Sequence, residues 1–111
     1  MRSAALTARG ASVLVLPNAG GEVNLAALLH ELAGRHMNEV HVEAGARLNG
    51  ALLQARLIDE LLVYLAPSIL GKGARGMFDV PELRELAERR ELDVCDVRMI
   101  GADVRVIARV R

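Results

Sequence analysis

Residues 38–67 constrain the fold most, because their apolar pattern changes from alternating to helical and then to continuous. Val40 and Val42 alternate with polar residues, as in a short strand. The small residues 44–46 predict a turn, and apolar residues then recur at helical spacing at Leu48, Ala51, Leu52 and Ala55. The run 61–65 is short enough for a buried strand. The pattern therefore predicts a strand, a tight turn, a helix and a strand.

The turn in this stretch suits an anion. A helix start carries backbone N–H groups without intrahelical partners and a partial positive charge. Gly45 lets a phosphate group approach the backbone there, and Glu43 at the end of the strand faces the same crevice. On spacing alone, the simpler interpretation is favoured: a glycine that only fits a tight turn, and a solvated glutamate.

The preceding part of the chain predicts another strand and helix. Residues 12–16 are a continuous run of β-branched and leucine side chains, typical of a buried parallel strand. Asn24 is a suitable N-cap for a helix. The apolar face of that helix comprises Leu25, Leu28, Leu29, Leu32 and Ala33.

The C-terminal part predicts a short helix and a hairpin. Residues 67–78 indicate a loop, and the sequence Asp-Val-Pro-Glu at 79–82 has the residue types of a helix start. Residues 93–99, with Cys95, Val97 and Met99 on one side, and 104–110 predict two strands around a turn. The whole order indicates an α/β fold with a mixed sheet: parallel βαβαβ plus a C-terminal antiparallel hairpin.

Length and charge exclude several classes. The 111 residues suit one domain, residues 1–111. Fourteen basic and fourteen acidic side chains cancel, and without a basic tract we expect no nucleic-acid partner. No apolar run approaches the roughly 18 residues of a membrane span, so we expect no membrane partner. A single cysteine and no secretory signal fit the cytoplasm.

The glycines of residues 71–76 match the pattern Gly-x-Gly-x-x-Gly. A dinucleotide fingerprint must leave a strand and open a helix directly, whereas here Pro67 intervenes and the next predicted helix starts only at residue 79. A flexible loop is the better interpretation, although Lys72 and Arg75 can help to hold an anion.

The histidines give little support for a metal site. His30 and His36 do not share a helix face, and a metal needs three or four converging ligands. His41 lies next to Glu43 on one predicted strand face, but a surface histidine is the more common explanation. We therefore predict no metal site.

Two further candidates are interpreted as structural. Cys95 in a strand pattern is more often a small core residue than a nucleophile. Asp59 and Glu60 are either paired catalytic carboxylates or a solvated turn between helix and strand, and the turn is favoured.

Several linked motifs resemble one known family, the C-terminal half of the reductase domain of the bifunctional riboflavin-biosynthesis deaminase/reductase. The resemblance covers nearly the whole chain and is strongest over 39–76. It rests on Glu43-Ala-Gly-Ala-Arg-Leu48, Gly50-Ala-Leu-Leu-Gln-Ala55, Ile58-Asp-Glu-Leu61, Tyr64-Leu-Ala-Pro67, Leu70-Gly71 and Ile100-Gly-Ala-Asp-Val-Arg105.

The resemblance implies a dihydrofolate-reductase-like fold, of which residues 1–111 form the C-terminal part of a single reductase domain. It implies NADPH-dependent reduction of 5-amino-6-(5-phosphoribosylamino)uracil, a pyrimidine ribosyl phosphate, to the ribitylamino product. Hydride transfer needs no covalent enzyme group, so no catalytic residue is assigned. Glu43 corresponds to the position that contacts the substrate in the family. The cofactor-binding positions are Gly45, Ala46, Arg47, Leu48, Asn49, Gly50 and Ala51.

The chain departs from the family in small and large ways. Ala44-Gly45 stands where the family frequently has Gly-Gly, and Ala46-Arg47 stands where it frequently has Pro-Thr. The loss of the threonine hydroxyl could weaken a phosphate contact, and Arg47 can supply a charge-assisted one instead. The family's leading reductase strands and its zinc deaminase half are missing, so we expect an incomplete active site. Two non-catalytic alternatives stay open: an oligomerisation module or a nucleotide-binding half-domain. An uncovered sheet also predicts a homodimer or larger homo-oligomer.

Overall fold

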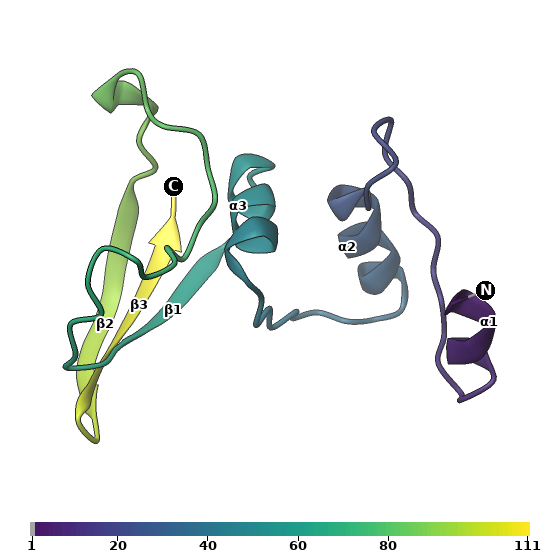
Figure 1. Cartoon of the computed structure of the whole chain (residues 1–111), viewed down its shortest axis with the longest axis horizontal. Coiled ribbons are helices and arrows are strands. Elements are labelled where there is room, and N and C mark those ends of the chain that lie inside the picture. Colours follow the sequence, from purple (N-terminus) through teal and green to yellow (C-terminus); the bar gives the residue numbers. More distant parts are fainter. Residues whose placement is uncertain (1) are drawn as a thin grey trace. The chain divides into compact units, whose positions relative to one another are not determined.

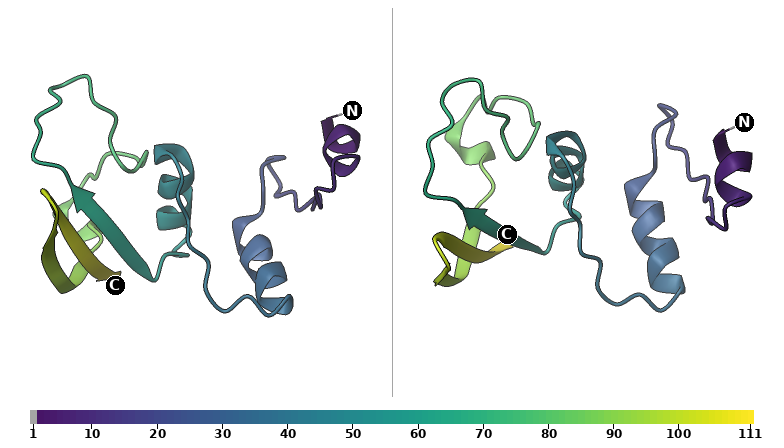
Figure 2. Two further views of the ribbon diagram at one scale, coloured as in Figure 1. Left: turned by 90° about the horizontal axis from the view of Figure 1, so that it is seen from below. Right: turned by 60° about the horizontal axis from the view of Figure 1, so that its bottom comes forward.

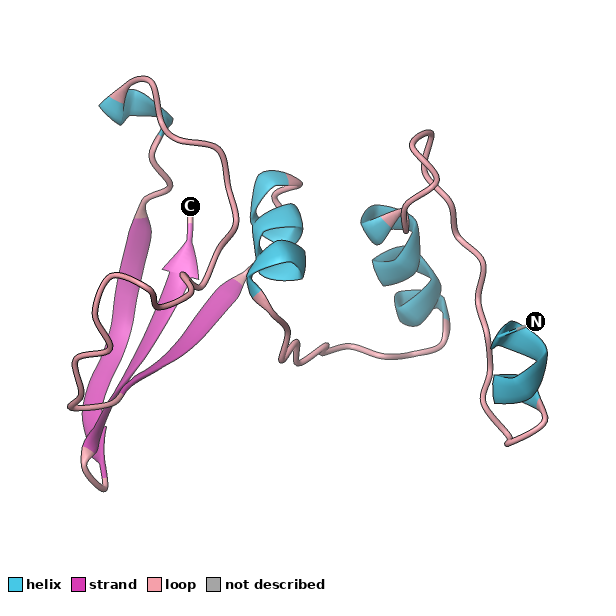
Figure 3. Ribbon diagram, viewed as in Figure 1, coloured by secondary structure: helices cyan, strands magenta, loops and turns pink. Residues whose placement is uncertain are grey.

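The computed structural model describes residues 2–111, and Figures 1 and 3 show its helices and strands. Contacts divide the chain into two units, one up to His41 and one from Val42. Within the described residues, none of the helices is both long and apolar enough to span a membrane.

The first unit contains two helices, α1 (Arg2–Thr7) and α2 (Leu25–Gly34). The predicted N-cap of α2 is confirmed, because the side-chain oxygen of Asn24 accepts a hydrogen bond from the N–H of Ala27 at 3.0 Å. The short helix α1 was not predicted, and all of its side chains are exposed. The alanines in it favour a helix by propensity, without an apolar stripe to reveal it.

The two N-terminal strands were predicted wrongly. Residues 12–16 are not a strand; near them the structure has only an isolated bridge between Pro17 and Val23. Residues 40–43 are not a strand either. A strand exists only where a neighbouring strand forms a hydrogen-bonded ladder with it, and within residues 2–111 the ladders join only β1, β2 and β3. The parallel βαβαβ part of the prediction is therefore not found in the described chain.

In the second unit, helix α3 (Ala46–Gln54) follows the predicted turn. Leu52 lies on its buried side and is only 7% exposed. The helix ends in a left-handed residue, Arg56, with φ of 57°. The N–H of Leu57 then donates to the carbonyl of Leu52 at 3.0 Å, and that of Arg56 to Leu53 at 3.2 Å, which is the closure of a Schellman motif.

Three strands form an antiparallel sheet in the order β1-β3-β2: β1 (Glu60–Leu65), β3 (Asp103–Val110) and β2 (Leu92–Ile100). Figures 1 and 2 show them side by side. The apolar run in β1 is a strand, as predicted, but it pairs antiparallel with β3. The predicted C-terminal hairpin is confirmed, and its turn uses Gly101 at a φ of 63°. The fold is therefore mixed α/β with a three-stranded antiparallel sheet.

An irregularity in β2 explains why its alternation looked imperfect in the sequence. The register shifts between Val94 and Asp96, so that Cys95 is the extra residue of a β-bulge. The predicted alternation of Cys95 with Val97 and Met99 is therefore interrupted, because Cys95 has no paired residue on β3. Val94 takes its place, because it pairs with Ala108, whereas the other two apolar residues pair with Val106 and Val104.

One face of the sheet is apolar in all three strands, and we call it the apolar sheet face. Its members are Leu61, Val63 and Leu65 of β1, Val104, Val106 and Ala108 of β3, and Val94, Val97 and Met99 of β2. Ala108 is 3% exposed, whereas the β2 members are about 60% exposed: 62%, 58% and 61% in order. This face is therefore covered over the central strand and uncovered over β2.

The opposite face carries a charge cluster that ties β2 to β3. The carboxylate of Asp96 accepts hydrogen bonds from Arg98 at 2.8 and 2.9 Å and from Arg105 at 3.0 Å. The bonds from Arg98, and then that from Arg105, hold the pKa of the Asp96 carboxyl below its usual range. The strand ends are tied in the same way, since Arg111 pairs with Asp93.

The predicted helix at 79–82 is absent. Residues between β1 and β2 form a long loop whose one regular element is η1 (Leu86–Glu88), a single 3₁₀ turn (Figure 3). The apolar residues of the expected helix have nothing to pack against: Leu83 is 54% and Leu86 75% exposed. A short helix is marginal in water without such packing. In addition, the N–H of Asp79 is used in a contact with α3.

Candidate functional site

The predicted site lies where an extended segment enters α3. Gly45 is the N-cap of this helix, with φ of −81° and ψ of 173°, and no side chain caps the helix there. By contrast, α2 begins with an asparagine side chain bound to its first turn. The N–H groups at the start of α3 therefore have no capping oxygen from the N-cap side chain, so they can serve an anion.

The space above this helix start is open. An added Cβ at Gly45 would have no atom within 4 Å beyond its immediate chain neighbours. Glu43, Gly45, Arg47 and Leu48 are exposed, and Ala46 is half-buried. The structure therefore places the predicted substrate residue and the first turn of α3 on one accessible stretch. Whether they bind a ligand stays a prediction.

Two of the predicted cofactor residues, Asn49 and Gly50, contact other parts of the chain. The side-chain amide of Asn49 donates to the carbonyls of Ala44 and Met77, both at 3.2 Å. The N–H of Asp79 donates to the carbonyl of Ala46 at 2.9 Å. Residues 77–79 therefore lie against the first turns of α3, and Asn49 joins that segment to the entry of the helix.

Gly50 allows this contact by having no side chain. It is buried, and an added Cβ would lie 2.1 Å from the carbonyl oxygen of Asp79 and 2.8 Å from its carbonyl carbon. Such a distance is impossible without moving the backbone. Gly50 therefore faces the chain itself, whereas Ala51, the last predicted cofactor residue, is exposed. Helical spacing could not reveal this packing role.

The glycine-rich loop at 71–76 does not lead into a helix. Its residues are exposed, Gly71 has a φ of 79°, and the N–H of Ala74 donates to the Gly71 carbonyl at 3.2 Å. This is turn geometry, so the context of a dinucleotide fingerprint is missing, as the sequence indicated. The loop is followed directly by residues 77–79, which we call the docked segment because they contact the start of α3.

The remaining candidates do not assemble into a reactive site. In residues 2–111, no three histidine, cysteine or carboxylate side chains are grouped closely enough to hold a metal. Cys95 is exposed rather than in a core, and its thiol lies 3.4 Å from the Asp93 carbonyl oxygen. Asp59 and Glu60 lie at the start of β1, where the Asp59 carbonyl accepts from the N–H of Val110 at 3.1 Å.

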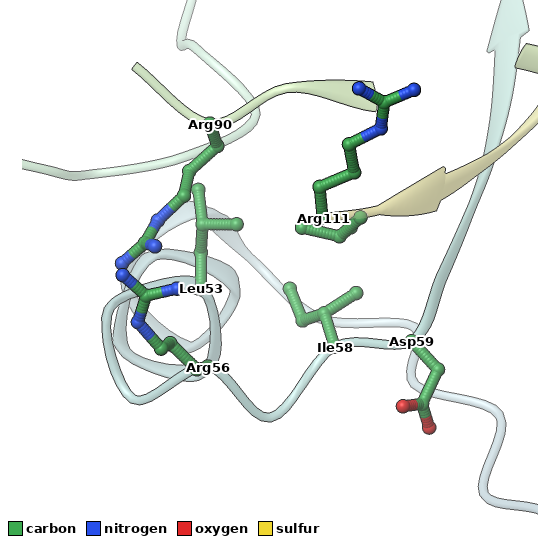
Figure 4. Close-up of a pocket in the computed structure, with 7 residues that line it drawn as sticks. Leu53, Arg56, Ile58, Asp59, Arg90 and Arg111 are labelled. Carbon is green, nitrogen blue, oxygen red and sulfur yellow. The ribbon is translucent and has the colours of Figure 1, made fainter. Parts of the chain in front are cut away.

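Sequence reasoning missed a pocket at the other end of α3, with a volume of about 180 Å³ (Figure 4). Its apolar lining is Leu53, Ile58 and Val110, and its charged lining is Arg56, Asp59, Arg90 and Arg111. The arginines come from a helix end, a loop and the C-terminus. No motif links such positions, because only the fold brings them together.

Replacing Gly50 by alanine should detach residues 77–79 from α3. The new Cβ cannot coexist with the Asp79 carbonyl, and overpacking of this kind costs on the order of 1–3 kcal/mol. We expect faster hydrogen exchange at the Asp79 amide, measured by NMR. Gly73→Ala is the matched control, since its Cβ would meet nothing within 4 Å. Equal protection of Asp79 in Gly50→Ala and the unmodified chain would contradict the docking role.

Comparison with known proteins identifies relatives over most of the chain. It is 43% identical to the riboflavin biosynthesis protein RibD of Escherichia coli over 91 residues, which cover 82% of this chain and 25% of that protein. It is 36% identical to the 5-amino-6-(5-phosphoribosylamino)uracil reductase of Buchnera aphidicola subsp. Acyrthosiphon pisum, covering 78% of this chain and 42% of the relative.

A solved structure of a RibD protein is similar to this chain. Acinetobacter baumannii RibD (form 2) superposes with a TM-score of 0.75 at 34% identity, over 81% of this chain and 25% of that one. The chain thus spans about a quarter of the length of the RibD relatives from E. coli and A. baumannii. Residues 2–106 match the RibD C-terminal domain, and the chain belongs to that family.

Proposed function

We propose that this chain supplies the nicotinamide-cofactor-binding part of a reductase of riboflavin biosynthesis. The reaction is the NADPH-dependent reduction of 5-amino-6-(5-phosphoribosylamino)uracil to its ribitylamino product. The observation that carries the proposal is the open, uncapped start of α3 at Gly45, directly after Glu43. The Buchnera relative is named as a reductase of this pyrimidine, which supports the choice of substrate.

The residues present fit a nucleotide phosphate. Gly45 leaves the backbone accessible, the first turn of α3 presents N–H groups, and Arg47 adds a guanidinium on the same exposed stretch. When bound, NADPH supplies the hydride. The chain's own contribution is to bind and orient: the helix start holds the phosphates, and Glu43 contacts the pyrimidine ribosyl phosphate.

Residues 77–79 are held beside this site. Asn49 donates to the carbonyl of Met77, and Gly50 leaves room for the backbone of Asp79 on the flank of α3. In this proposal these two residues position the cofactor site without touching the ligand. The rest of the reductase must come from further chain, which would also pair with residues 12–16 and 40–43 in a dihydrofolate-reductase-like sheet. We place the reaction in the cytoplasm.

The proposal is tested in a chimaeric reductase, in which this chain replaces the matching segment of the E. coli relative. Gly45→Val adds a side chain to empty space at an ordinary φ, so it introduces no steric clash, although valine is a poorer N-cap than glycine. We expect its KM for NADPH to rise at least about tenfold, because each lost charge-assisted contact is worth ~1.5–3 kcal/mol. Glu43→Ala should lower kcat/KM for the pyrimidine substrate by a similar factor.

Gly73→Ala serves as the control and should leave both constants unchanged. Unaltered kinetics in both Gly45→Val and Glu43→Ala would contradict the site assignment. A rise in both KM values in every variant, the control included, would show a general loss of structure instead.

The second candidate function is self-association, either as a homodimer of the reductase or as a non-catalytic module. It is favoured by the apolar sheet face, whose members in β2 are mostly exposed. Exposed apolar patches of this kind mark interfaces. Light scattering of the chain should give a mass of at least twice 12.0 kDa. Val97→Asp should lower that mass, and a monodisperse monomer of the unmodified chain would exclude self-association.

A further inference from the structure

We propose that the pocket at the C-terminal end of α3 binds a small phosphate-containing anion between the guanidinium groups of Arg56 and Arg90. Figure 4 shows these two side chains pointing toward one another at one side of the pocket. They come from separate parts of the chain, one just after α3 and one just before β2. The inference concerns a different site from Gly45 and does not rest on the proposed function.

The charges of the pocket are unbalanced. Within residues 2–111, neither Arg56 nor Arg90 has a carboxylate partner. The third arginine is already paired, since Arg111 bonds to Asp93 and Glu91. The carboxylate of Asp59 points away from the two guanidiniums in Figure 4. Two like charges that face each other are stabilised when an anion lies between them.

The backbone at Arg56 adds a second observation. Its φ of 57° belongs to the left-handed region, where glycine or asparagine commonly ends a helix. A long charged side chain at this position costs stability relative to glycine. The negative end of the helix accounts for a cation at Arg56 alone, but it does not account for Arg90, which is not part of α3.

The shape and chemistry of the pocket define the ligand class. Leu53, Ile58 and Val110 give the pocket an apolar lining beside the arginines, and about 180 Å³ leaves room for several water-sized groups. The planar guanidinium forks bind phosphate oxygens in a bidentate way. The geometry therefore favours a phosphate monoester or a diphosphate, held by two arginines over an apolar surface.

The test is a titration of the complete 15N-labelled chain with inorganic pyrophosphate at low ionic strength. We expect saturable NMR shifts at the side-chain Nε–H groups of Arg56 and Arg90. Arg56→Gln and Arg90→Gln should each weaken binding at least about tenfold, since a hydrogen bond to a charged group is lost in each. Arg90→Lys should keep part of the affinity, because it keeps the charge without the fork.

Arg84→Gln is the matched control, because Arg84 is exposed and lies outside the pocket lining. Equal weakening by this control would show non-specific charge attraction and overturn the proposal. An absence of saturable shifts at Arg56 and Arg90 would also overturn it. Shifts confined to the amides of residues 46–48 would place the anion at the start of α3, which contradicts this inference while supporting the proposed cofactor site.

Discussion

The second unit depends on β3, because both other strands form their hydrogen bonds with it. β1 pairs with one edge of β3 and β2 with the other. Ala108 in the middle of β3 is nearly inaccessible, at 3% exposure. The strand thus acts as the common template of the sheet. A one-residue change of register of β3 would move the apolar side chains of this strand to the opposite face.

The candidate site is built on α3, and the two ends of this helix lie in different chemical environments. Its start has an exposed glycine and no capping side chain, so it offers N–H groups to an anion. Its end is closed by a Schellman motif and carries Arg56 opposite Arg90. Between them, the missing side chain of Gly50 lets the backbone at Asp79 approach the helix. One short helix therefore organises the candidate cofactor site, the docked loop and the arginine pocket.

Local patterns predicted the parts of the fold whose causes are local. The N-cap at Asn24, the helix that contains Leu52 and the hairpin turn at Gly101 depend on residues close in sequence, and all three are found in the structure, although Leu48, Ala51 and Ala55 of the predicted apolar stripe are exposed. The segments 12–16 and 40–43 carry strand-like sequences but belong to no strand of the described chain. Their structure is decided by non-local pairing, which no local pattern can supply.

The candidate site was predictable only in outline. The position of Glu43 and Gly45 before a helix follows from the change of period, and the structure has that arrangement. The packing role of Gly50 and the facing of Arg56 and Arg90 depend on tertiary contacts between distant residues. The same is true of the bulge at Cys95, where one extra residue moves the following side chains to the opposite face.

The most direct measurement is a calorimetric titration of NADPH into this chain and into its Gly45→Val variant. We expect saturable binding to the unmodified chain with a Kd below about 1 mM, the upper range of ordinary substrate affinities. We also expect the variant to lose this binding while keeping its fold. No binding at millimolar NADPH, or equal binding by the variant, would contradict the claim that the start of α3 is a working cofactor site.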